Sequence, residues 1–227
     1  QQTSDGMAGL VGFRQLGVAF LLAHLAAASS GCYADAPVAG SSLPLLVYSH
    51  GYGGNMDMAA YFLRAVAARG TVVAALEHTD GTASSTLLAD GTRLDFAPGL
   101  LSGAASLGRR ADEIVEAVGH LPSVLPVDGA RIFAGGHSYG APSAILAARR
   151  CASVAGLIMH DPALAMGYGL LGTGPTVPTI SYTSDEYNRA GVTCGDVTLH
   201  VRGAYHGKYT CFEQNEVMLQ PEVYSIM

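Results

Sequence analysis

The segment Gly-His-Ser-Tyr-Gly at residues 136–140 constrains the fold of this chain more than any other feature. It has the form G-x-S-x-G. A β-prone apolar run at residues 131–135 precedes it, and an alanine-rich, helix-prone run at residues 141–150 follows it. A serine on a sharp strand-to-helix turn needs glycines around it, because side chains there would keep the strand and the helix apart. The pattern therefore predicts a nucleophile elbow that presents Ser138 at the end of a strand.

Strand and helix patterns alternate along the rest of the chain. The expected strands cover residues 43–48, 71–76, 154–160, 178–182 and 196–202, and the expected helices cover residues 56–69 and 107–120. Such alternation favours an α/β fold, with one mostly parallel central sheet and helices on both faces. No internal repeat marks a second domain. We therefore expect one domain over residues 1–227, with an apolar helical segment at 1–40 and a catalytic core at 41–227.

The composition is that of a folded domain with few charges. Hydrophobic residues make up 49% of the chain and charged residues only 13%, which argues against intrinsic disorder. The net charge of −6 argues against a nucleic-acid partner. The sequence has no run of Lys and Arg, no Walker-type phosphate loop and no Cys/His cluster at zinc spacing. We therefore expect no metal, nucleotide or organic cofactor.

A nucleophilic serine needs a base, and the base needs a group that orients it. His206 lies on a Gly-flanked loop after the last expected strand, where its ring can reach Ser138. His200 lies inside that strand and is interpreted as structural. Asp161 and Asp185 each follow a strand, and parallel sheets place their chemistry at the carboxyl ends of strands. The spacing alone leaves both acids as candidates.

Three segments resemble the platelet-activating factor acetylhydrolases of the plasma and type II group. Residues 46–54, Leu-Val-Tyr-Ser-His-Gly-Tyr-Gly-Gly, are similar to the oxyanion-loop segment of that family. Residues 71–85 resemble its V-A-A-x-E-H-x-D-x-S-A-S region, and residues 202–206 match its R-G-x-x-H loop. The resemblance runs in order from about Leu10 to about Phe212, which is most of the chain.

The resemblance implies an α/β-hydrolase fold and favours one of the two acids. In that family the acid follows the strand after the nucleophile helix, in an L-D-x-W or L-D-P-W context. Residues 160–163 of this chain read His-Asp-Pro-Ala, with alanine in place of the tryptophan. The resemblance therefore favours Asp161 over Asp185.

These residues define an expected mechanism. Ser138 attacks an ester carbonyl, His206 takes the serine proton and later gives it to the leaving alcohol, and Asp161 orients the histidine. Backbone N–H groups must stabilise the oxyanion that forms. We expect one from Tyr139, the residue after the nucleophile, and the other from Tyr52 in the glycine-rich loop.

The reaction class is better defined than the substrate. The resemblance implies hydrolysis of short or oxidised acyl groups from phospholipids. A general carboxylesterase and a chlorophyllase-like hydrolase are alternatives among enzymes, and a non-catalytic interaction subunit is an alternative of another class. Residues 78–106 and 164–177 are expected to be long loops whose apolar residues fit either a substrate pocket or simple packing.

Residues 16–28 are apolar apart from His24, and Ser-Ser-Gly-Cys follows them. This pattern resembles the core of a signal peptide, which favours a secreted or organellar location. It is short for a membrane span. We interpret the segment as a docked helix, with a peripheral membrane contact or an unprocessed targeting segment as alternatives.

The four cysteines allow two bridges in three ways, and a bridge from Cys194 to Cys211 would brace the His206 loop. Free buried thiols fit the sequence equally well. The oligomeric state does not follow from the sequence.

Overall fold

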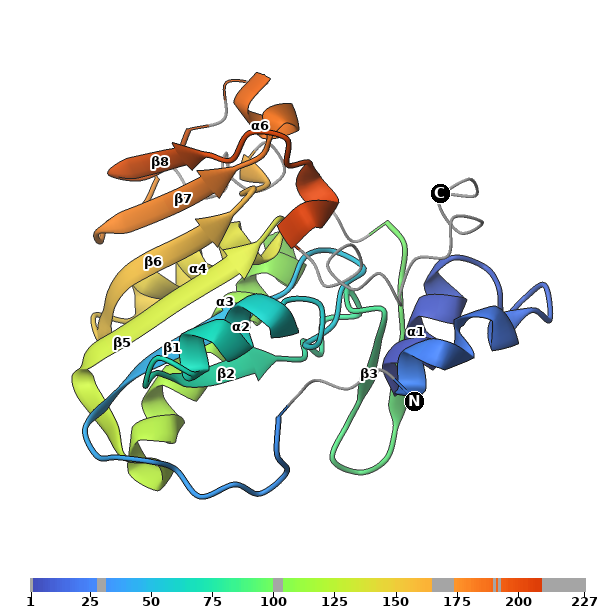
Figure 1. Cartoon of the computed structure of the whole chain (residues 1–227), viewed down its shortest axis with the longest axis horizontal. Coiled ribbons are helices and arrows are strands. Elements are labelled where there is room, and N and C mark those ends of the chain that lie inside the picture. Colours follow the sequence, from blue (N-terminus) through green and yellow to red (C-terminus); the bar gives the residue numbers. More distant parts are fainter. Residues whose placement is uncertain are drawn as a thin grey trace.

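The computed structural model of the chain describes residues 2–27, 32–99, 104–164, 174–189, 191 and 193–209. Six parallel strands form its central sheet in the order β2-β1-β5-β6-β7-β8 (Figure 1). The strands are β1 (Leu43–Ser49), β2 (Val72–Leu76), β5 (Val127–His137), β6 (Val154–His160), β7 (Thr179–Thr183) and β8 (Val197–His200). The mostly parallel sheet predicted from the alternation is confirmed.

Helices cover both faces of this sheet, as predicted. Helix α2 (Ala60–Ala67) lies on one face, and α3 (Ala104–Val124) and α4 (Gly140–Arg150) lie on the other (Figure 1). Successive side chains of a strand point to opposite faces. Leu45 and Val47 of β1 accordingly pack into the large core beneath α3 and α4, whereas Leu46 and Tyr48 pack with Leu63 of α2.

Two helices differ in length from the sequence expectation. Helix α2 begins four residues later than predicted, because the Asn55 side chain accepts a hydrogen bond from the N–H of Asp57 and favours a turn there (3.1 Å). Helix α3 is longer at both ends and includes Pro122. A proline disrupts a helix less near its end than in its middle. The sequence pattern nevertheless predicts that the helix ends before the proline.

The segment between β2 and α3 is not simply a loop. It contains an antiparallel hairpin of β3 (Ser85–Leu87) and β4 (Arg93–Asp95), which was not predicted because three-residue strands carry almost no periodic signal. Helix α1 (Gln2–Leu10) contacts β3 and packs with the 3-10 helix η1 (Ala19–Ala27). No helix among the described residues is long and apolar enough to cross a membrane.

Two short elements lie at the carboxyl ends of the last two strands. Helix α6 (Asp185–Arg189) follows β7, and the 3-10 turn η3 (His206–Tyr209) follows β8. Most of the expected loop at residues 164–177 lies outside the described residues, as does Cys211. Cys151 and Cys194 are free thiols.

Candidate active site

Ser138 lies on a strained turn between β5 and α4. Its φ of +54° is in the left-handed region that a residue with a side chain rarely adopts. The flanking glycines are sterically required: a Cβ at Gly136 would lie 2.4 Å from the carbonyl carbon of Gly140. A Cβ at Gly140 would lie 2.1 Å from the carbonyl oxygen of Ser49. The segment therefore has the geometry of a nucleophile elbow.

The elbow lies at the point where the order of the strands reverses. The chain passes from β1 to β2 on one side and continues with β5 on the other, so β1 and β5 are neighbours. Loops after two such strands diverge and leave a crevice at their carboxyl ends. The loop at residues 50–54 after β1 meets the elbow there, and a Cβ at Gly51 would lie 3.1 Å from the Cβ of Ser138.

The structure brings Asp161 and His206 together. Asp161 follows β6, is fully buried, and has its Oδ2 3.2 Å from Nδ1 of His206. The other carboxylate oxygen accepts a 2.6 Å hydrogen bond from the N–H of Ser184. Its backbone N–H donates to the carbonyl oxygen of Tyr182, and the N–H of Ser138 donates to the residue before Asp161 (both 2.9 Å). These contacts link the elbow to the end of β6 and orient the carboxylate toward the imidazole.

Asp185, the other acid considered, lies against different groups. Its Oδ1 is 2.6 Å from Nε2 of His200, and its Oδ2 accepts a 2.9 Å hydrogen bond from the N–H of Gly203. These hydrogen bonds, that from His200 foremost, lower the pKa of the Asp185 carboxyl. The N–H of Asp185 also donates to the carbonyl oxygen of Ala204 (2.9 Å). Asp185 therefore holds the segment that leads into His206 instead of contacting its ring.

His137 packs behind the catalytic loop. Its Nε2 donates a 3.1 Å hydrogen bond to the carbonyl oxygen of His206, and the two rings lie 4.5 Å apart. Burial, together with the nearby His206, holds the pKa of His137 well below its usual range. A neutral His137 is therefore a structural support beside Ser138.

Tyr52, in the loop after β1, packs against Tyr139 at the start of α4. Their rings meet edge to face with centroids 6.1 Å apart, and Tyr52 also contacts Phe96 (4.9 Å). Tyr139 precedes the first turn of α4, at the end of the helix dipole that favours negative charge. In the loop after β1, the N–H of Gly53 donates to Thr82 and that of Gly54 donates to Gly51.

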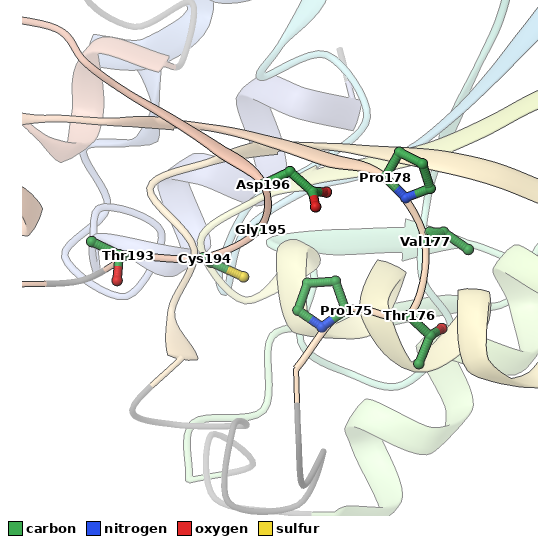
Figure 2. A pocket seen from close by; sticks show the side chains of 8 residues that line it. All are labelled: Pro175, Thr176, Val177, Pro178, Thr193, Cys194, Gly195 and Asp196. Atoms are coloured by element: carbon green, nitrogen blue, oxygen red, sulfur yellow. The ribbon is translucent and has the colours of Figure 1, made fainter.

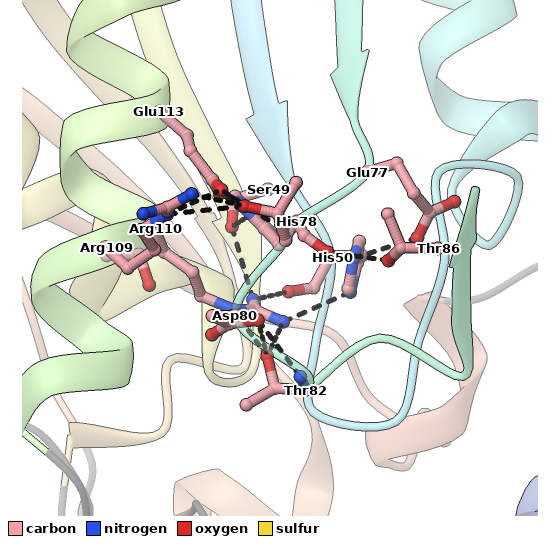
Figure 3. Close-up of polar contacts among 12 residues, drawn as sticks. Ser49, His50, Glu77, His78, Asp80, Thr82, Thr86, Arg109, Arg110 and Glu113 are labelled. Carbon is pink, nitrogen blue, oxygen red and sulfur yellow. Dashed lines mark hydrogen bonds and ion pairs between the residues drawn. The ribbon is translucent and has the colours of Figure 1, made fainter. Parts of the chain in front are cut away.

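A buried ion pair joins α3 to the segment after β2 and lies beside the loop after β1 (Figure 3). Arg110 of α3 is fully buried and its Nε donates to Asp80 (3.1 Å). Its Nη1 donates to the carbonyl oxygen of His50 (2.6 Å), and its Nη2 donates to Thr82 (2.6 Å). The guanidinium also lies over the ring of Tyr139, 5.2 Å from its centroid. A single side chain thus contacts the loop after β1 and the residue after Ser138.

The same network includes a neutral histidine (Figure 3). Burial, reinforced by the charge of Arg110, holds the pKa of His78 well below its usual range. Its Nδ1 lies 2.6 Å from Glu113, so that nitrogen carries the proton, and its Nε2 accepts from Ser49 at 2.7 Å. Sequence analysis did not identify this network. The polar run at residues 77–86, directly after a strand, was its signal, but the partners lie on a helix some 30 residues later.

A cavity of about 570 Å³ lies away from this site (Figure 2). It is lined by residues 175–178 and 193–196, which precede β7 and β8. Ser138, Asp161 and His206 all lie at the carboxyl ends of strands of the same parallel sheet. The cavity lies at the amino ends of its strands, on the opposite side of the sheet. Among the described residues, no three His, Cys, Asp or Glu side chains converge as a metal site requires.

Solved structures of esterases share this architecture. A ferulic acid esterase from Streptomyces cinnamoneus superposes with a TM-score of 0.58 and 21% identity, over 74% of this chain and 53% of its own. An esterase from Pyrobaculum calidifontis superposes with a TM-score of 0.53 and 16% identity, over 84% of this chain and 76% of its own. The chain thus spans about half the length of the ferulic acid esterase. The fold is that of the α/β-hydrolases.

A family model matches the first part of the chain. The model of platelet-activating factor acetylhydrolase, isoform II, matches residues 2–94, which include the loop after β1 and the polar run after β2. No curated protein matches the sequence. The chain therefore has the α/β-hydrolase fold, and over residues 2–94 it is similar to this family. Ser138, Asp161 and His206 lie outside the matched residues.

Proposed function

We propose that this chain hydrolyses carboxylic esters through an acyl-enzyme on Ser138, with His206 as base and Asp161 as the orienting acid. The observation that carries the proposal is the 3.2 Å contact between His206 and the buried Asp161, next to a serine at φ +54°. A strained backbone that persists at the mouth of a crevice is typical of a catalytic turn. The close packing around Gly136 and Gly140 holds the backbone of Ser138 in that strained conformation.

The reaction has two balanced steps. Ser138 Oγ attacks the ester carbonyl while His206 Nε2 takes the hydroxyl proton, and the proton then passes to the leaving alcohol as the acyl-enzyme forms. A water molecule, deprotonated by His206, attacks the acyl-enzyme and releases the acid and free Ser138. The Asp161 carboxylate accepts the Nδ1–H of His206 throughout, which keeps Nε2 directed to the substrate and stabilises the imidazolium.

Backbone donors would stabilise the oxyanion in both steps. The N–H of Tyr139 lies at the start of α4, where the helix dipole favours negative charge. In the facing loop, Gly53 and Gly54 use their N–H groups within the protein, which supports Tyr52 as the second donor. Arg110 supports both donors through its contacts with His50 and the Tyr139 ring.

The proposed substrate is a phospholipid with a short or oxidised acyl group. The match to the acetylhydrolase family supports this class, and the rings of Tyr52 and Phe96 supply an apolar wall beside the crevice. The exposed Leu16 (74%) and Phe20 (69%) of the N-terminal segment support a peripheral contact with a lipid surface. A membrane contact would deliver such a substrate without a spanning helix.

Labelling with a fluorophosphonate probe tests the function. Wild type should be labelled, and Ser138→Ala should abolish the labelling without changing the melting temperature by more than a few degrees. A panel of sn-2 phospholipid acyl chains of increasing length, beside simple aryl esters, then tests the substrate. A sharp preference for short acyl chains supports the phospholipid proposal, whereas equal use of aryl esters points to a general carboxylesterase. A folded wild type that is not labelled would favour a non-catalytic interaction subunit.

A further inference from the structure

The His206 ring needs more than Asp161 to stay in one orientation. Its side chain is about one-third exposed (32%), and the loop that carries it is short and contains Gly203. The tilted ring of His137 lies 4.5 Å away, but a single hydrogen bond at Nδ1 still lets the imidazole tilt about that bond. A catalytic base must point its other nitrogen at the serine within about 0.5 Å.

Tyr187 of α6 packs directly on this imidazole. The two rings are stacked, with an interplanar angle of 4° and centroids 4.8 Å apart. A parallel ring at that distance blocks the tilt that the Asp161 hydrogen bond permits. Burial and the charge of Asp161 raise the pKa of the Tyr187 phenol, and the side chain of Ser138 partly offsets this rise. Tyr187 therefore contacts the residue that would carry the proton.

Helix α6 is tied to the same loop by its own acids. The Oε2 of Glu186 accepts a 2.9 Å hydrogen bond from the N–H of His206. Asp185 accepts from Gly203 and donates to Ala204, both at 2.9 Å. These backbone contacts fix the position of α6 relative to His206. The hydrogen bonds of Asp185 and Glu186 therefore keep Tyr187 of the same short helix against the imidazole.

The start of α6 is also linked to the orienting acid. The N–H of Tyr187 donates to the hydroxyl of Ser184 (3.4 Å), and the N–H of Ser184 donates to Asp161 (2.6 Å). Tyr187 thus lies on a short helix that contacts His206 and is preceded by a residue that contacts Asp161.

We propose that Tyr187 is a positioning residue whose ring holds the His206 imidazole in line with Ser138. The inference rests on the proposed ester hydrolysis. The ring carries the effect, and the hydroxyl is not required for it. The face of an aromatic ring also attracts a cation, so the stack favours the imidazolium that forms when the serine proton is taken.

Two substitutions distinguish the role of the Tyr187 ring from that of its hydroxyl. Tyr187→Leu removes the stack, and we expect kcat for p-nitrophenyl acetate to fall roughly 10- to 100-fold with KM changed less than threefold, since misplacement by about 1 Å can cost that much. Tyr187→Phe keeps the stack and should retain at least a third of wild-type kcat. Tyr33→Leu is the matched control, because this tyrosine is 89% exposed, and it should behave as wild type.

A second readout does not depend on turnover. Ring currents of a stacked tyrosine shift the Cε1–H and Cδ2–H resonances of His206 upfield in NMR spectra, and a His206→Gln variant assigns them. Tyr187→Leu should reduce the upfield shift to the part that the tilted His137 ring contributes, and Tyr187→Phe should keep it in full. Unshifted resonances in wild type would overturn the stack itself.

The outcomes distinguish the two proposals. An active wild type with an equally active Tyr187→Leu would overturn the positioning role and leave the ester hydrolysis standing. Equal losses in Tyr187→Leu and Tyr187→Phe would overturn the role of the ring. A wild type that is neither labelled nor active would overturn the proposed function, and the positioning role with it, even where NMR shows the stack.

Discussion

Arg110 donates a 2.6 Å hydrogen bond to the carbonyl oxygen of His50, two residues before the proposed oxyanion donor Tyr52. The same guanidinium is paired with Asp80 and covers the ring of Tyr139. Because the pair is buried, removing one partner would leave an uncompensated charge in the interior. The two segments that border the nucleophile therefore depend on one ion pair for their spacing.

Arg110→Met should lower the free energy of unfolding by roughly 3–5 kcal/mol, the usual cost of breaking a buried pair from one side. Urea unfolding measures this loss. Arg109→Met is the control on the same helix: its side chain is 63% exposed, and the change should cost less than about 1 kcal/mol. Equal losses in the two variants would contradict a special role for the buried pair.

Gly140→Ala should prevent the elbow from closing. The new Cβ would lie 2.1 Å from the Ser49 carbonyl oxygen, a backbone atom that cannot move aside. We expect a loss of about 3 kcal/mol or more and loss of fluorophosphonate labelling. Gly119→Ala, in α3, adds the same methyl group where no atom lies within 4 Å. That control should be neutral or stabilising by up to about 1 kcal/mol, because alanine favours a helix.

The two acids should differ sharply on replacement by asparagine. Asp161→Asn should lower kcat by roughly 10³- to 10⁴-fold, because an amide favours the wrong histidine tautomer. Asp185→Asn should lower it less than tenfold, since Asp185 contacts the backbone before His206 and not the ring. Kinetics with p-nitrophenyl acetate measure both. A larger loss in Asp185→Asn would transfer the orienting role to that residue.

Stability should fall between pH 7 and pH 5. Burial lowers the pKa of His160 to about 4, below the value of 6.5 that it has when unfolded. The unfolded chain therefore binds the proton first as the pH falls, which lowers the free energy of unfolding. His160 alone should contribute about 2 kcal/mol of this loss. Chemical unfolding at the two pH values measures the difference, and His160→Gln should reduce it by a similar amount; an unchanged difference would contradict this origin.

The exposed apolar residues of the N-terminal segment should promote lipid binding. Replacing Leu16 and Phe20 together by serine should lower the affinity for phosphatidylcholine vesicles roughly tenfold, measured by sedimentation with sucrose-loaded vesicles. Leu87→Ser is the control, because that leucine is also exposed (57%) but lies on the hairpin. Equal binding by the double variant and wild type would exclude this segment as the contact.

Much of the sheet was predictable because its signals are local. The strand at residues 154–160 was predicted with its exact bounds, since a buried apolar run ends sharply at Asp161-Pro162. The hairpin of β3 and β4 was not, because each strand has three residues and depends on packing against α1. The turn at Asn55 shortened α2 through a side-chain hydrogen bond that periodicity does not register.

The sequence by itself determined the elbow, the glycine-rich loop and the loop that carries His206, because each is specified by residues adjacent along the chain. Only the tertiary structure decided which carboxylate lies beside His206 and that Arg110 and Tyr187 support the site. Those relationships join residues 19 to 60 positions apart, and sequence spacing carries no information about which strand ends meet. The order of strands in the sheet brings Asp161 to the imidazole and leaves Asp185 to hold the backbone before it.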